Sequence, residues 1–136
     1  MKPKFSRKKS ISLTFRGFDL NPWELESLVG VKASLIGIRG KPIKSGVMTP
    51  LLRSCVIFSI DFPKDRRLDE MFPALFAQLG GVNHLCSVRD LVRPEFFEIN
   101  VVLPIKKSPE QEGGEFPPEI IKDLYLLRAS LSFEFL

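Results

Sequence analysis

The chain has 136 residues, of which 44% are hydrophobic, and 20 lysines and arginines against 16 acidic residues give a formal net charge of +4. A chain of this length typically folds around one core, and charges or prolines interrupt every apolar run before the roughly 20 residues that a bilayer-spanning helix needs. The composition therefore predicts one soluble domain and excludes a membrane-spanning protein.

The excess of positive charge lies at the amino terminus. Five bases and no acids fall within residues 1–9: Lys2, Lys4, Arg7, Lys8 and Lys9. Without these five, 15 bases face 16 acids, a net charge of −1 over residues 10–136. We therefore expect residues 1–9 to form a basic, disordered tail and residues 10–136 to form a single α+β domain. Only the tail could bind nucleic acid, weakly and with strong salt dependence.

The start of the chain and its cysteines predict a cytoplasmic location. The basic start is followed by alternating apolar and polar residues, not by the apolar stretch of a secretory signal. Cys55 and Cys86 are too few for a disulfide scaffold and form no CxxC pair, as is typical of reduced thiols in a reducing compartment. The simplest interpretation is that both are small buried hydrophobic residues.

The first elements are a strand and a short helix. Apolar residues alternate with polar ones over Ser10–Arg16, which predicts a strand with one buried face. Asn21 then suits a helix N-cap, Pro22 suits the first helical position, and Gly30 suits a stop. The sequence predicts a helix over Pro22–Val29 that buries Leu25, Leu28 and Val29.

A long connection and a strand follow. Val31–Thr49 is rich in glycine and is predicted to be a connection with one short strand around Ser34–Ile38. Leu52–Asp61 is predicted to be a strand, and apolar residues on both of its faces favour a central place in the sheet.

The second half of the chain alternates helices and strands. Apolar residues recur at helical spacing from Leu68 to Leu79, so that Pro73 must either kink the helix or mark a late start. The remaining predicted elements are a short helix at Val82–Leu91, a strand at Glu95–Leu103, a helix after Pro117 and Pro118, and a strand at Ala129–Phe135.

Together these elements predict an α+β fold. We expect a single layer of four to five mostly antiparallel strands with two to four helices packed on one face, because the strands alternate strongly between apolar and polar residues. The other face of the sheet should be more open.

No motif in the sequence indicates chemistry. His84 is the only histidine, and Cys86, two residues away, would point elsewhere on a helix, so we interpret His84 as structural or solvent-exposed. Gly40 and Lys41 superficially resemble a phosphate loop, but Pro42 follows them and the earlier glycine is missing. One histidine and two distant cysteines do not make the usual structural zinc set. We predict no catalytic residue, no cofactor and no metal.

Trp23 is the one side chain with an unusual predicted position. On the first helix it points roughly opposite to Leu25, so it either lies on the outer surface as an anchor for a protein partner or folds over the loop Val31–Arg39 and is buried there. An exposed Trp23 favours a protein-binding role.

The segment FRGFDLNPWELESLVGV and the closing LRASLSFEFL resemble the uncharacterised bacterial family catalogued as domain of unknown function 4279. The resemblance extends from about Ser10 to Leu136 and departs from the family at Ala33 and Ser34. Its most specific positions are Gly17, Asp19, Leu20, Pro22, Glu24, Leu28 and Gly30. The resemblance implies a small bacterial α+β fold, and it supplies no catalytic residues.

Two functions are consistent with these observations. The first is a non-catalytic protein-binding domain, specifically an immunity protein that neutralises a cognate bacterial toxin of a contact-dependent or polymorphic system, because small members of the family look similar to such proteins. The second is a small-molecule-binding or enzymatic domain with a site under the 31–49 connection, since long irregular loops are often functional. The sequence leaves the oligomeric state open.

Overall fold

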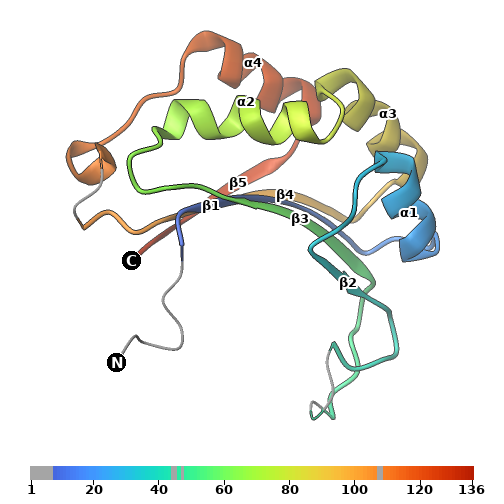
Figure 1. Cartoon of the computed structure of the whole chain (residues 1–136). Helices are drawn as coiled ribbons and strands as arrows, with labels where there is room; N and C mark the ends of the chain where they lie inside the picture. Colours follow the sequence, from blue (N-terminus) through green and yellow to red (C-terminus); the bar gives the residue numbers. More distant parts are fainter. Residues whose placement is uncertain (1–7, 44–45, 47, 107–108) are drawn as a thin grey trace.

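The computed structural model of the chain describes residues 8–43, 46, 48–106 and 109–136. These residues form one curved sheet with four α-helices on its convex face (Figure 1). The strands are β1 (Ser10–Arg16), β2 (Leu35–Gly37), β3 (Cys55–Asp61), β4 (Phe96–Leu103) and β5 (Ser130–Phe135). The helices are α1 (Pro22–Val29), α2 (Leu68–Gln78), α3 (Val82–Val92) and α4 (Pro118–Leu127), and a short 3-10 helix, η1, covers Pro109–Glu112.

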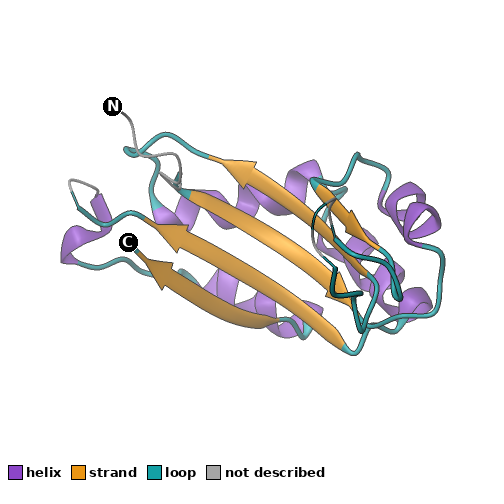
Figure 2. Cartoon of the chain, turned by 90° about the horizontal axis from the view of Figure 1, so that it is seen from below, coloured by secondary structure: helices purple, strands orange, loops and turns teal. Residues whose placement is uncertain are grey.

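The strand order is β2-β3-β1-β4-β5, and every neighbouring pair is antiparallel except β4 and β5, which are parallel. Figure 2 shows the open side of this sheet, with the helices behind it. Strand β1 is central, and Leu13 lies opposite Phe58 of β3 and Ile99 of β4. The fold class predicted from the sequence is confirmed.

The core lies between the sheet and the helices. Ile11, Leu13 and Phe15 of β1 are fully buried there, as are Phe72 and Leu75 of α2. Burying a side chain of this size contributes roughly 1.5–3 kcal/mol to folding. The alternation of apolar and polar residues in β1 therefore determines which face of the sheet meets the helices. A one-residue shift in the pairing register of β1 would turn these three side chains toward solvent.

The opposite, concave face of the sheet carries polar side chains across its middle. A row of small polar side chains crosses it in register: Ser59, Ser12, Asn100 and Ser132. The Ser132 hydroxyl donates to Asn100 Oδ1 at 2.8 Å, and Asn100 Nδ2 donates to Glu134 Oε1 at 3.2 Å. These bonds satisfy the polar groups without a second layer of helices.

Two details of the predicted elements differ from the structure. Strand β3 begins at Cys55 and not at Leu52, because the Leu51 N–H and C=O bond to Lys41 and Gly40 and close the preceding loop. Strand β3 is also second from the edge, so the central strand is β1. Helix α2 starts at Leu68 and includes Pro73, whose ring lies on the exposed side of the helix.

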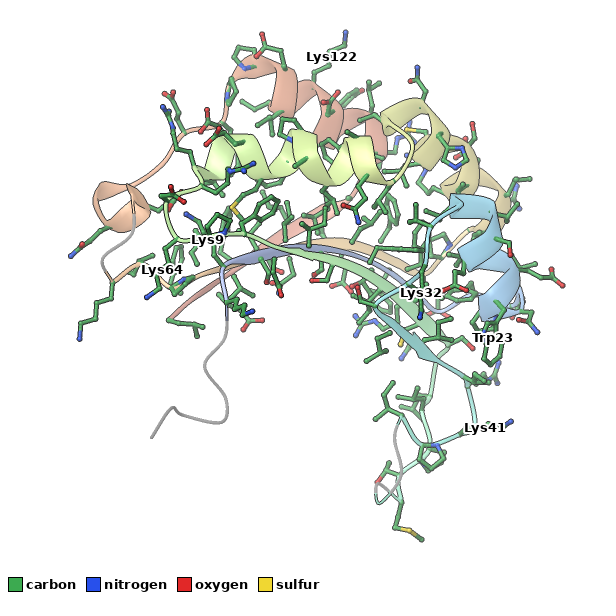
Figure 3. All side chains as sticks on the ribbon, viewed as in Figure 1. Lys9, Trp23, Lys32, Lys41, Lys64 and Lys122 are labelled. Atoms are coloured by element: carbon green, nitrogen blue, oxygen red, sulfur yellow. The ribbon has the colours of Figure 1, made fainter. Side chains whose placement is uncertain are left out.

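Lys9 belongs to the folded body, although its charge grouped it with the predicted tail. Lys9 is 1% exposed, and its Nζ donates to the carboxylate of Glu110 at 2.5 Å and to the backbone carbonyls of Arg66 and Lys64. Figure 3 shows Lys9 and Lys64 at the same end of the sheet. A charge count could not detect this ion pair, because its partner lies 101 positions away in the chain. Residues 1–7 of the predicted tail lie outside the described residues.

None of the described helices is both long enough and apolar enough to cross a bilayer.

Candidate functional site

The start of α1 places Trp23 on the outside of the molecule. Asn21 caps the helix, since its Oδ1 accepts the Trp23 backbone N–H at 2.9 Å, and Pro22 occupies the first helical position. Leu25 and Val29 turn inward and are buried. Trp23 consequently projects from the other side of the helix (Figure 3), and its side chain is half-exposed, at 52%. Of the two predicted positions, the structure places Trp23 on the surface.

Leu28 joins Trp23 on that side, which corrects the prediction that it is buried. Leu28 is 37% exposed, and Leu91 near the end of α3 is 71% exposed. With Leu20, these side chains line a surface hollow of about 760 Å³ between α1 and α3. We call Leu20, Trp23, Leu28 and Leu91 the α1 surface. Single exposed apolar residues are common, but a tryptophan grouped with three leucines is typical of an interaction site.

A second hollow, of about 600 Å³, adjoins the α1 surface and shares Leu20 and Leu91 with it. Three arginines line this hollow: Arg39, Arg53 and Arg93. The side chains of Arg39 and Arg93 make no ion pair with the described residues, whereas Arg53 Nε lies 3.0 Å from Glu95 Oε2. Asp19 and Glu95 also line the hollow, so three bases against two acids leave it a net charge of +1 beside an apolar patch.

Contacts on the open face of the sheet hold Arg53 in place. Its guanidinium lies 5.2 Å from the centre of the Phe96 ring, and Arg16 lies 4.4 Å from the same ring. Arg16 is in turn paired with Glu98 at 3.0 Å. Exposed pairs of this kind contribute less than about 1 kcal/mol each, but together they limit the directions in which Arg53 can point.

The structure gives His84 a bonding role between helices. Its Nε2 lies 3.0 Å from the backbone carbonyl oxygen of Val29, at the end of α1, so the ring links α3 to α1. The ring also packs against Gly80, where an added Cβ would come within 2.7 Å of it. Within the described residues no nucleophile or carboxylate bonds to His84, and no group of three or more His, Cys, Asp or Glu side chains could hold a metal ion.

The two cysteines are free thiols in different surroundings. Cys55 is buried, whereas Cys86 is partly exposed and contacts the Leu126 carbonyl at 3.5 Å. Burial raises the pKa of the Cys55 thiol above its ordinary value, and the Gly37 backbone and the Arg16 charge oppose this effect only in part.

We expect iodoacetamide at neutral pH to alkylate Cys86 before Cys55. The thiolate is the reactive form, and a raised pKa leaves less thiolate at Cys55 near neutrality. Mass spectrometry of peptides sampled during the reaction measures both rates, and the Cys55 rate should climb further as the pH is increased toward 10. Faster alkylation of Cys55 than of Cys86 in the folded protein would contradict this prediction.

Within the 31–49 connection, Gly37 at the end of β2 is packed closely by Ile43 and by two residues that follow the connection, Leu51 and Cys55. A Cβ on Gly37 would lie within 3.0 Å of Leu51, Cys55 and Ile43, so only glycine fits between them. One described residue of this connection, Arg39, lines the second hollow together with Arg53 and Arg93. A small-molecule site under the connection stays a prediction.

Comparison of the chain with protein-family models, with curated proteins and with solved structures found no match. The resemblance to domain of unknown function 4279 thus stays a prediction from the sequence.

Proposed function

We propose that this chain is a non-catalytic protein-binding domain that acts as an immunity protein, and that it binds its cognate toxin through the α1 surface. The observation that carries the proposal is the exposure of Trp23, at 52%, beside a hollow lined by Leu28 and Leu91. Tryptophan is the residue type most enriched among the side chains that dominate binding energy, and a neighbouring hollow gives an inserted partner side chain a place to bury.

The adjoining arginines define the chemistry of the partner. A toxin segment with one large apolar side chain for the α1 surface and carboxylates for Arg39 and Arg93 would complement both hollows. Arginine binds carboxylates through two parallel hydrogen bonds, so these contacts would add orientation to the apolar anchor. An acidic partner would also complement the positive charge of this hollow. Such charge complementarity raises the association rate at low salt.

Co-expression tests this function. The polypeptide encoded next to this chain would be produced in a bacterial host with and without the chain, and growth would be recorded. We expect the polypeptide to stop growth alone and the chain to restore it through a stable complex seen by gel filtration. Growth arrest that the chain does not relieve, with no complex formed, would overturn the proposal.

A further inference from the structure

The outer edge of β5 is the most complete unpartnered interaction surface of the described chain. Strand β5 is the last strand of the sheet, and its inner edge pairs with β4 (Figure 2). The Leu136 N–H donates to the Leu103 carbonyl, which sets the direction of the backbone groups. Because these groups alternate along a strand, the N–H and C=O groups of Leu131, Phe133 and Phe135 point outward, away from β4.

Helix α4 adds an apolar flank above this edge. Ile120 and Leu127 face the core, and Leu126 lines a hollow beside Gly80 and Gly81, on the side of α3. Ile121 and Tyr125 are four residues apart and therefore share the side of the helix that faces away from α3. Ile121 is 57% exposed and Tyr125 is 76% exposed.

We propose that the occupant of this surface is a second copy of the chain, whose β5 pairs antiparallel with the first across a two-fold axis through Phe133. In that register Leu131 lies opposite Phe135 of the other copy, and Phe133 lies opposite itself. All three outward-pointing residues then exchange both of their backbone bonds, and two five-stranded sheets become one. This inference is independent of the proposed function.

Charge favours this register over its neighbour. A shift that centres the axis on Glu134 would set this carboxylate opposite itself, whereas the proposed register sets it opposite Ser132 of the other copy.

Four large side chains that such a dimer would cover are more than half exposed: Ile121, Tyr125, Phe135 and Leu136. At roughly 200 Å² for a large side chain they expose on the order of 500 Å². The strand backbone brings the contact close to the roughly 800 Å² per partner of a stable interface.

The pairing also places the aromatic side chains together. Tyr125 is in the last turn of α4, which leads directly into the start of β5. Phe135 of the second copy would lie beside Leu131 at that same point, beneath Tyr125. Phe135 already stacks on Phe133, with ring centres 5.9 Å apart, so it is held in place for this contact. An unpaired apolar edge of this kind would otherwise be an aggregation hazard.

Light scattering after gel filtration, over a dilution series of the full chain, tests the dimer. We expect a mass of twice 15.4 kDa. The variant I121K/Y125K should weaken association by about 30-fold or more, because it puts like charges into the apolar contact. Leu91→Lys is the matched control, since it adds a charge at an exposed leucine on α3, and it should stay dimeric.

Hydrogen exchange followed by NMR gives a second readout that does not depend on any variant. The amides of Leu131, Phe133 and Phe135 should exchange slowly in the dimer and at least 10-fold faster on dilution to the monomer. A wild-type chain that is monomeric at every concentration would overturn the inference. So would a dimer that I121K/Y125K leaves intact, or one in which these three amides exchange freely.

Discussion

Replacing Glu110 by alanine should lower the free energy of unfolding by about 3–5 kcal/mol, the cost of leaving a buried charge without its partner. The Lys9 ammonium is fully buried, and in the variant its remaining partners among the described residues are the carbonyls of Lys64 and Arg66. Through these bonds Lys9, which directly precedes β1, contacts both the loop before α2 and η1. At roughly 4 °C per kcal/mol for a chain of this length, the melting temperature should fall by about 12–20 °C.

Urea denaturation followed by circular dichroism measures this change, and two variants serve as controls. Glu115→Ala removes an exposed carboxylate from the same segment, with a side chain that is 78% exposed, and should change stability by less than about 0.5 kcal/mol. The double variant Lys9→Met with Glu110→Leu removes both charges and should recover most of the loss. A wild-type melting temperature for Glu110→Ala would show that Lys9 is not buried as described.

If the chain binds a toxin as proposed, replacing Trp23 by alanine should weaken that binding by about 30-fold or more while the melting temperature changes by only a few degrees. A central tryptophan typically contributes at least 2 kcal/mol to an interface, which is about 30-fold in Kd. The half-exposed ring contributes much less to folding, because only half of its surface leaves water when the free chain folds. Isothermal titration calorimetry measures the affinity.

The matched control is Tyr125→Ala, which removes an exposed aromatic side chain from α4 on another side of the molecule. It should leave the affinity for the toxin unchanged, and Trp23→Ala should leave the mass in solution unchanged. An equal loss of affinity in both variants would place the binding surface elsewhere. This pair of variants also separates the proposed toxin interface from the proposed dimer interface.

The sequence predicted the regular elements well where one residue pattern determines them. Alternation determines β1 and β5, and the signals at Asn21, Pro22 and Gly30 give the bounds of α1 that the structure has. The position of β3 in the sheet was not predictable from its own residues. Apolar side chains on both faces indicate burial but not strand order, and it is the pairing of β2 along the outer edge of β3 that makes β3 second in the sheet.

The candidate site was only partly predictable. Trp23 could be assigned from helix geometry, but Leu91 comes from α3, 68 positions further on, and local patterns carry no information about which helices become neighbours. One signal was present, because Leu85, Val88 and Val92 form the core stripe of α3 and leave Leu91 outside it. Arg93 likewise lines the second hollow. It is itself the left-handed residue that caps the end of α3, with φ of 52°.

The intrinsic fluorescence of Trp23 tests the central claim most directly, because it is the only tryptophan in the chain. In the free protein its emission should be red-shifted and readily quenched by acrylamide. On titration with the toxin, the emission should shift to the blue and quenching should fall, because the ring leaves water. Blue, quench-resistant emission from the free chain, or a spectrum that full complex formation leaves unchanged, would contradict a binding surface built around this side chain.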